Sequence, residues 1–528
     1  MMEETMVQFS RRAVLLAGAS ACAPTAFGPI RRARAANGAR PSLPIPPELR
    51  ADASHAIALH ARPGSMRFYG AAGPATATYG INGAYLGPAV RVRRGETVVA
   101  QVSNSVPEDI TMHWHGLIIP GAADGGPYQV IPFGKRWQTE LLVDQPAATL
   151  WFHPHLYPST ADLVIKGLAG LIIVDDDESG RLPLPSRWGV DDIPLIIQDR
   201  RFKSDGQFFA RFNIVAVTNG YVGDTALVNG ALYPEARTAR GWIRLRILNG
   251  SNARSYALAA SDRRSLYVIA SDGGLLESPV ELKELLIHAG ERFEVLVDGR
   301  NGNAFDLVTL PVSQPIMRLP PFDGPLPLVT FRPESADGKG QLPDSLAVLP
   351  SLPEQLPPVS QELVMNMFRD QQGMMALKKA GLMAMAQSGK TDPAVVARVV
   401  DLIVNGSALA QSDQLSSNGV NGAPFALGEK GFGAVPNQDL LWRISEGSDQ
   451  MLHPVHIHGC QFRIVSQNGK PPEPQRAGWK DVAPISAGGV TEILVRFPHS
   501  ASRNDPYMAH CHILEHEDSG MMTQFTVA

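Results

Sequence analysis

The sequence has few cysteines, no excess of either charge and no long apolar run. Its 528 residues include three cysteines, Cys22, Cys460 and Cys511, too few for a disulfide framework. The 47 basic and 51 acidic residues leave a net charge of −4 and no basic face, so we expect no nucleic-acid partner. Beyond the N-terminus no uncharged apolar run reaches the length of roughly 18 residues that a spanning helix needs, and we expect no membrane span.

Glycine and proline are the residues in excess. The 49 glycines and 43 prolines occupy 92 of 528 positions, more than in average proteins. Because turns need residues with positive or fixed φ, this composition favours turn-rich β structure over helical bundles, coiled coils or disorder. The length suggests about three domains, each large enough to bury its own core.

The N-terminus has the pattern of an export signal. Arg11 and Arg12 precede the apolar stretch 13–26, and an A-x-A cleavage site follows. The paired arginines resemble a twin-arginine signal, so 1–36 predicts export of a folded protein by the twin-arginine machinery to a bacterial periplasm. An N-terminal helix is the alternative, and a lipoprotein signal around Cys22 is less favoured because its upstream residues do not match.

A pair of strand-like segments recurs three times along the chain. The first member, an alternating apolar run that ends in Asn, Gly or Ser, occupies 91–105, 240–252 and 439–449. The second member occupies 134–144, 290–298 and 488–497. Apolar alternation with period two indicates half-buried strands, and its threefold recurrence indicates three copies of one β-sandwich. We therefore predict sandwich domains at 41–180, 190–340 and 400–528.

The β pattern is interrupted between the second and third predicted domains. Residues 342–358 are rich in proline and are typical of a linker. Residues 361–387 contain six methionines among Ala, Leu and Lys, and their second half has helical propensity. We predict that 341–399 forms this linker and a short, partly helical, methionine-containing insert.

Ten of the 14 histidines fall in four short motifs, which include four His-x-His pairs. The pairs are His113 with His115, His153 with His155, His456 with His458, and His510 with His512. Residues two apart on an extended strand share a face, so each pair can present two imidazoles to one place. The pairs lie in the first and third copies of the repeat, whereas the middle copy has none. We therefore predict a shared site between those copies, with enough imidazoles for three metal ions.

Cys511 lies between two of these histidines and points to the opposite face if the segment is extended. The natural partners of its thiolate are His453, His516 and Met521 in the same region of sequence. Two imidazoles, one thiolate and a weak thioether are typical of a blue-copper electron-transfer site. A structural zinc site is the alternative, but it would not need eight further histidines.

These motifs resemble those of the multicopper oxidases over nearly the whole chain after the predicted signal. Within that family the sequence is similar to bacterial periplasmic cuprous oxidases of the CueO type, through VDQPAATLWFHPH, GDTALVNGALYP, SDGGLLESPVEL, AGWKDV and AHCHILEHEDSGMM. The resemblance implies an all-β fold of three cupredoxin-like Greek-key sandwich domains. It also implies four copper ions as cofactors, one of type 1 and a trinuclear cluster of one type 2 and two type 3 ions.

The resemblance assigns the ligands motif by motif. The type 1 ligands are His453, Cys511, His516 and Met521, and the type 2 ligands are His113 and His456. The type 3 ligands are His115, His153, His155, His458, His510 and His512. Electrons then pass from type 1 copper through Cys511 to His510 and His512.

The implied reaction couples four one-electron oxidations of a reductant to reduction of dioxygen to two waters. Because this reduction consumes protons, carboxylates are expected near the cluster, and Asp124 and Glu517 match the proton-relay residues of the family. Asp124 also begins Asp-Gly-Gly, which is a good turn without any catalytic role.

The resemblance places a substrate copper site at Met365, Asp370, Asp449 and Met451. Thioethers suit the soft cuprous ion, and carboxylates suit the cupric product. Alternatively, Met365 and Asp370 belong to a segment that packs its methionines into a lid or core. The insert departs from the family pattern because it contains no histidine, and Cys460 stands where we expect Thr or His, which we interpret as a buried free thiol.

The sequence thus supports three hypotheses. The first is a monomeric periplasmic cuprous oxidase that serves copper tolerance, with Cu(I) and dioxygen as substrates. The second is a laccase-like oxidase of small aromatic reductants, namely phenols or aromatic amines. The third is a copper-free cupredoxin-fold protein with a structural or cell-division role, which the complete ligand set disfavours.

Overall fold

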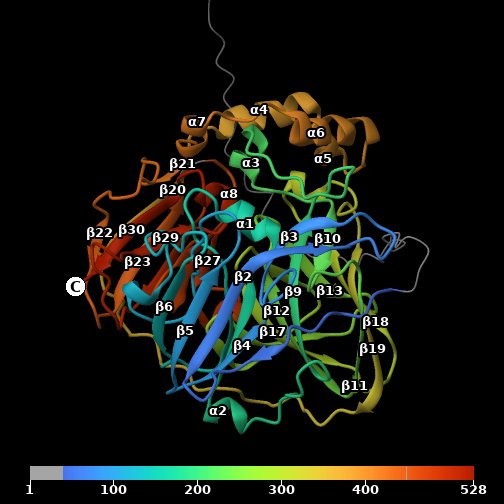
Figure 1. Ribbon diagram of the computed structural model, residues 1–528, viewed down its shortest axis with the longest axis vertical. Helices are drawn as coiled ribbons and strands as arrows, with labels where there is room; N and C mark the ends of the chain where they lie inside the picture. Colours follow the sequence, from blue (N-terminus) through green and yellow to red (C-terminus); the bar gives the residue numbers. More distant parts are fainter. Residues whose placement is uncertain (1–39, 448) are drawn as a thin grey trace, which may run out of the picture.

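The computed structural model describes residues 40–447 and 449–528. The signal predicted at 1–36, which includes Cys22, lies outside these residues. Within the described chain the strands form six sheets that pack in pairs around three hydrophobic cores, giving three β-sandwiches (Figure 1). The predicted all-β class and its three sandwiches are confirmed.

The first sandwich consists of two four-stranded sheets. One contains, in order, β1 (Glu48–Leu49), β4 (Ala89–Arg93), β8 (Gly170–Asp175) and β7 (Ala148–Phe152). The other contains β3 (Thr76–Ile81), β2 (Ala56–Met66), β5 (Thr97–Asn104) and β6 (Arg136–Leu142). Its loops carry η1 (Gly121–Ala123), α1 (Thr160–Lys166) and α2 (Asp177–Gly180).

The second sandwich packs against the first. One sheet contains β10 (Thr225–Val228), β9 (Asp192–Arg200), β12 (Trp242–Asn249), β17 (Arg292–Asp298), β14 (Leu266–Ser271) and β15 (Gly274–Leu282). The other contains β11 (Glu235–Arg240), β19 (Leu326–Asp337), β18 (Phe305–Leu310), β13 (Tyr256–Ala260) and β16 (Leu285–Ile287). Strands β9 and β12 are buried on both faces because Ile196 and Leu248 pack outward against Trp151 and Leu171 of the first sandwich.

The third sandwich begins before its predicted boundary at 400. One sheet contains β21 (Asn418–Val420), β20 (Val359–Met367), β23 (Leu440–Glu446), β28 (Val490–Val495), β25 (Phe462–Gln467) and β26 (Trp479–Lys480). The other contains β22 (Phe432–Ala434), β30 (Met522–Val527), β29 (Tyr507–Cys511), β24 (His453–Ile457) and β27 (Val482–Ile485). Strand β20 comes from the segment predicted as linker and insert, yet it pairs in parallel with β23.

The recurring segments of the sequence form equivalent strand pairs in the three sandwiches. They become β5 with β6, β12 with β17, and β23 with β28, each an antiparallel pair of neighbours. In each sandwich the first strand of the pair also has a parallel neighbour on its other side, namely β2, β9 or β20. The repeat in the sequence is therefore a repeat of sheet topology.

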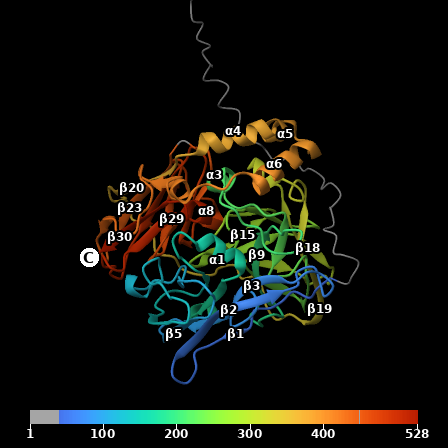
Figure 2. The same ribbon diagram turned by 45° about the horizontal axis from the view of Figure 1, so that its top comes forward.

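The insert is helical over most of its length and lies at one end of the molecule (Figure 2). It consists of α4 (Asp370–Ala380), α5 (Leu382–Ser388), α6 (Pro393–Asn405) and α7 (Gln411–Leu415). The Asp392 carboxylate caps α6 by accepting hydrogen bonds from the Ala394 and Val395 amides. The insert packs on α3 (Ile214–Asn219) and η2 (Pro315–Arg318) of the second sandwich through an apolar cluster. No described helix is long and apolar enough to cross a membrane.

Candidate metal centre

Eight histidines from the first and third sandwiches meet in one buried cluster. They are His113, His115, His153, His155, His456, His458, His510 and His512, none more than 1 % exposed. The register of β24 and β29 pairs His456 with His510, and a bridge between His113 and His153 does the same in the first sandwich. The structure therefore brings together all four predicted pairs.

Imidazole nitrogens from the two sandwiches face one another across this cluster. Between the two sandwiches, the Nε2 atoms of His113 and His456 lie 3.3 Å apart and those of His155 and His510 lie 3.1 Å apart. Within the third sandwich, the Nε2 atoms of His458 and His510 lie 3.2 Å apart. Three of the five groups of possible metal ligands among the described residues consist wholly of these histidines, and a fourth combines His115 and His456 with Asp481. The geometry thus places donor atoms of both sandwiches around common points.

Oxygen acceptors hold the Nδ1 atoms of five of these histidines. The contacts are His113 to the Asp124 carbonyl at 3.0 Å, His153 to the Pro154 carbonyl at 2.8 Å, His456 to the Asp481 carbonyl at 2.8 Å, His458 to Asp124 Oδ2 at 2.7 Å, and His510 to the Cys511 carbonyl at 3.1 Å. Each Nδ1–H donates, so the Nε2 lone pair points into the cluster, as in metal-binding histidines. His115 is reversed, with Nε2 3.0 Å from Asp481 Oδ1 and Nδ1 3.4 Å from His153 Nε2.

The cluster is chemically suited to a metal. Burial, reinforced by neighbouring positive groups, lowers the pKa of His115, His153, His456, His458 and His512 well below the usual range. Neutral imidazoles offer lone pairs, and both ring nitrogens of His512 are buried without a hydrogen-bond partner. Such orphaned atoms are costly unless a cation binds them, and imidazole suits copper. The residues therefore fit the copper ions that the resemblance implies.

A second group of ligands surrounds Cys511 at the end of β29. The Cys511 Sγ atom lies 3.5 Å from His453 Nδ1 and 3.7 Å from His516 Nδ1, and all three residues are fully buried. Met521 is also fully buried and packs in the same core, where its carbonyl accepts a hydrogen bond from the Cys511 amide. The structure thus brings together the four residues predicted around the thiolate. Cys460 is a separate, buried free thiol whose pKa is raised by burial.

Two buried carboxylates adjoin the histidine cluster, as the sequence predicted. Asp124 binds His458 through Oδ2, while its Oδ1 is buried without a hydrogen-bond partner. Glu517, on α8 (Leu514–Glu517), lies 3.2 Å from His510 Nδ1 and 3.4 Å from His155 Nδ1. Both carboxylates therefore face the cluster from behind its ligands.

Sequence reasoning missed an ion pair that joins the middle sandwich to this cluster. The Arg292 guanidinium on β17 binds both oxygens of Asp481, at 2.6 and 2.5 Å, and its Nη1 lies 3.2 Å from His115 Nε2. Both charged side chains are fully buried. The signal available in the sequence was an arginine at the start of an apolar strand, GERFEVLVD, and an aspartate in AGWKDV.

The predicted substrate copper residues are only partly assembled. Asp449 Oδ2 lies 3.1 Å from His453 Nε2, and its Oδ1 accepts a hydrogen bond from the Met451 amide. Met365 is fully buried at the end of β20 in the core against which Met451 packs. Asp370 begins α4 and makes no hydrogen bond or ion pair with these residues in the described chain. Two further insert methionines, Met374 and Met375, are about half exposed.

Comparison with protein families and curated relatives gives a consistent result. Three models described as multicopper oxidase match residues 65–179, 209–313 and 400–528. The cell division protein FtsP of Yersinia pestis is 35% identical over 502 residues, which cover 94% of each chain. The multicopper oxidase mco of Staphylococcus aureus is 34% identical and covers 89% of this chain and 88% of its own.

Solved structures show the same fold. A laccase-like multi-copper oxidase CueO from the lignin-degrading bacterium Ochrobactrum sp. is 38% identical, with a TM-score of 0.78 over 92% of this chain and 100% of its own. A multi-copper oxidase from Pediococcus acidilactici is 30% identical, with a TM-score of 0.76 over 95% of this chain and 94% of its own.

Proposed function

The chain belongs to the multicopper oxidase family, and we propose that it is a cuprous oxidase that binds four copper ions. The observation that carries this proposal is the complete donor set: eight clustered histidines, together with Cys511 and its three partners. When bound, the copper ions would accept electrons singly from a reductant and reduce dioxygen to water. We assign His453, Cys511, His516 and Met521 to the type 1 ion.

The histidine cluster holds the other three ions in this proposal. The type 2 ligands are His113 and His456, and the type 3 ligands are His115, His153, His155, His458, His510 and His512. The oxygens that fix Nδ1 keep the Nε2 lone pairs aimed inward before any metal arrives, which reduces the cost of ordering the ligands. Cys511 is covalently joined to His510 and His512 and so provides the electron path between the two centres.

Asp124 and Glu517 relay protons in this proposal. Dioxygen reduction consumes four protons, and burial of the cluster excludes free exchange with bulk water. Asp124 Oδ1 is buried without a hydrogen-bond partner, so it can accept a proton and release it toward the cluster. Glu517 lies within 3.4 Å of the Nδ1 atoms of His510 and His155, so protons can pass between its carboxylate and these imidazoles. A carboxylate that contacts the imidazole of a proposed ligand is well placed to act as a proton donor.

The proposed substrate is the cuprous ion, oxidised in the periplasm after twin-arginine export of a monomer, in the service of copper tolerance. The contact of Asp449 with His453 supports this, because a carboxylate there can hold a cation beside the electron acceptor. Met451 lies two residues from each and supplies a thioether.

A laccase-like activity on phenols or aromatic amines is the second candidate. It is favoured by the burial of Met365 and the separate position of Asp370, which leave the substrate copper site less complete. The Ochrobactrum relative is described as oxidising lignin model compounds. A cell-division role, suggested by the relatives named FtsP, is disfavoured because a structural protein does not need this complete donor set.

Experiments on the copper-loaded protein test both the proposed copper centres and the proposed substrate. We expect an intense blue absorption that disappears in Cys511→Ser, and a colourless copper-loaded protein would refute the enzyme class. Rates of Cu(I) and phenol oxidation are then compared in the Asp449→Asn/Met451→Leu double variant. Loss of Cu(I) oxidation with retained phenol oxidation supports the cuprous oxidase, whereas equal retention of both favours the laccase.

A further inference from the structure

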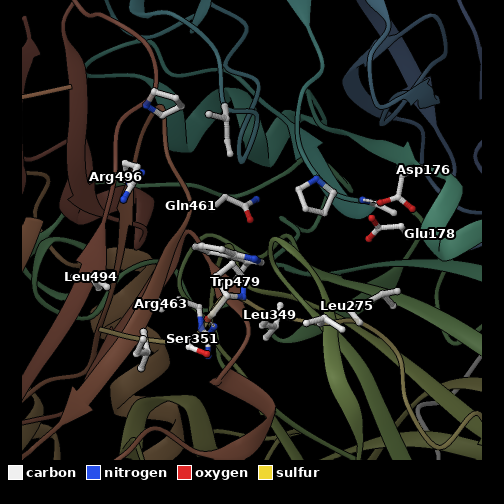
Figure 3. A pocket seen from close by; sticks show the side chains of 18 of the residues that line it. Asp176, Glu178, Leu275, Leu349, Ser351, Gln461, Arg463, Trp479, Leu494 and Arg496 are labelled. Atoms are coloured by element: carbon white, nitrogen blue, oxygen red, sulfur yellow. Dashed lines mark hydrogen bonds between the residues drawn. The ribbon is translucent and has the colours of Figure 1, made fainter. Parts of the chain in front are cut away.

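A pocket of about 700 Å³ is lined in part by α2, which lies at the end of the molecule opposite the insert helices (Figure 1). Its walls come from all three sandwiches, including α2, and from the linker segment 346–353 (Figure 3). None of the proposed copper ligands lines it. One link to the histidine cluster is Gln461, whose side chain donates a hydrogen bond to the Gly116 carbonyl, next to His115, at 3.3 Å. The pocket is therefore distinct from the metal centre and from the proposed electron-donor site.

One arginine of the pocket has no carboxylate partner. The other two have partners: Arg94 with Asp144 at 3.4 Å, and Arg496 with Asp439 at 2.9 Å. The Arg463 side chain makes no ion pair within the described chain, and its one hydrogen bond is from Nη1 to the Pro350 carbonyl at 3.4 Å. Burial disfavours its charged form and lowers its pKa, and the nearby charge of the exposed Glu277 offsets this only in part. A half-buried cation without a counter-ion is the feature that an incoming anion would neutralise.

An aromatic surface adjoins this cation. The Arg463 guanidinium lies 5.9 Å from the centre of the Trp479 ring, and both side chains line the pocket (Figure 3). Leu275 and Leu349 line it as well, and apolar side chains supply much of the remaining wall. A flat aromatic ligand can bury its faces there, while a charged group at its edge reaches the guanidinium.

The acidic residues of the pocket do not remove its preference for an anionic ligand. The Asp176 carboxylate accepts hydrogen bonds from the Ala147 and Ser179 amides, at 2.8 and 2.7 Å, and is therefore already satisfied. Glu178 is exposed, so solvent screens its charge more strongly than that of Arg463. The charge in the pocket that lacks a partner is therefore the positive charge of Arg463.

We propose that this pocket binds a small aromatic carboxylate, with its carboxylate on Arg463 and its ring against Trp479. The volume lies within the range usual for small-molecule sites and holds a ligand of one or two rings. The carboxylate would pair with the Arg463 guanidinium, whose only side-chain hydrogen bond among the described residues is the one from Nη1 to the Pro350 carbonyl.

Titration calorimetry with trans-cinnamate tests this assignment, with trans-cinnamamide as the neutral analogue of the same shape. Neither ligand is a phenol, so binding is measured without turnover. We expect cinnamate to bind with a Kd of about 1 mM or tighter. We expect the amide to bind about tenfold more weakly, because it cannot form a charge-assisted pair.

The variants locate the binding site. Arg463→Gln should remove the preference for the acid over the amide, and Arg463→Lys should keep part of it. Arg496→Gln is the matched control, since that arginine lies in the same wall but is already paired, and the preference should persist. Equal binding of acid and amide by the wild-type protein, or no cinnamate binding at about 10 mM, would overturn the proposal. So would an acid preference that survives in folded Arg463→Gln.

Discussion

Arg292 is the residue through which the middle sandwich acts on the histidine cluster. It binds Asp481 through two hydrogen bonds, and Asp481 in turn contacts His115 Nε2 through a side-chain oxygen and His456 Nδ1 through its carbonyl. A buried guanidinium thereby orients two imidazoles that the middle sandwich does not itself carry. We interpret Arg292 as a positioning residue for the proposed trinuclear site.

The variant Arg292→Gln should bind less copper in the histidine cluster while keeping the blue type 1 centre. Removing one partner of a buried ion pair costs about 3 to 5 kcal/mol, because it leaves Asp481 charged and uncompensated. Copper content and the electron paramagnetic resonance signals of the two centres measure the effect. Arg332→Gln, which removes a partly exposed pair with Glu235, should change neither signal. An unchanged copper content in Arg292→Gln would contradict the positioning role.

Asp124→Asn separates the structural role of Asp124 from its proposed role in proton transfer. Asparagine can still accept the hydrogen bond from His458 but cannot carry a proton, so copper binding and blue colour should be retained. Dioxygen reduction should slow by about 100-fold or more, as for loss of a general acid. Steady-state oxygen consumption measures this. A rate within about twofold of the wild type would show that Asp124 only orients its histidine.

The residues of the two proposed copper centres could be predicted from sequence to lie together, because histidine and cysteine are typical metal-binding residues and here lie in short motifs. Arg292 and Asp481 could not, because arginine and aspartate are common residues and their pairing joins positions 189 residues apart. The contact exists only after the second and third sandwiches have packed together. The pocket around Arg463 was missed for the same reason.

The turn after η1 (Gly121–Ala123) both redirects the chain and presents a carboxylate to the histidine cluster. Asp124 begins a turn, and its carboxylate also faces the histidines, because Gly125 adopts a φ of 79°. A Cβ atom there would lie 1.8 Å from the Met112 carbonyl oxygen. Only glycine allows this close approach of the turn to the segment that carries His113.

Gly125→Ala should therefore displace the turn and weaken copper binding at His113 and His458. The stability cost should exceed the roughly 1 kcal/mol expected for positive φ alone. Gly134→Ala is the control, since its φ is also positive, at 74°, but no atom lies within 4 Å of the added Cβ. Thermal unfolding and copper content of the two variants are compared. Equal losses in both would mean that the close contact at Gly125 has no importance.

Strand β20 belongs to the third sandwich, although the sequence predicted its residues to be part of the linker and insert. Its residues lie between a proline-rich linker and a methionine-rich helix, so they were predicted as part of the insert. In the structure Leu363 and Met365 point into the core of the third sandwich, while the remaining positions are partly or fully exposed. Its membership of the sheet depends on parallel pairing with β23, which begins more than 70 residues later. Pairing over such a distance leaves little local signal.

At the scale of the whole molecule, buried charges fasten the sandwiches to one another. Glu294 on β17 accepts hydrogen bonds from Arg244 and Arg246 of its own sheet, at 2.8 and 2.9 Å, and from Thr149 of the first sandwich at 2.7 Å. Burial alone raises the pKa of Glu294, but the two arginines outweigh it and lower the pKa to about 2. The folded protein therefore holds this carboxylate charged at pH values where the unfolded chain protonates it.

The sign of this shift predicts an acid-labile interface. The stabilisation from Glu294 is complete above the unfolded pKa of 4.5 and is lost as the pH falls toward 2. It amounts to a few kcal/mol at most, since one pKa unit corresponds to about 1.4 kcal/mol. Urea unfolding of the copper-free protein at several pH values measures this free energy.

Glu294→Gln isolates the contribution of this one carboxylate from other groups that titrate in the same range. The variant should be less stable at pH 7, because Arg244 and Arg246 lose their counter-charge, and its stability should fall less steeply between pH 4.5 and 2. Glu492→Gln, which removes the partly exposed pair with Arg443, should follow the wild-type curve within about 1 kcal/mol. If Glu294→Gln kept the full wild-type slope, the acid sensitivity would have to arise at other carboxylates, and the junction of the first two sandwiches would not depend on this charge.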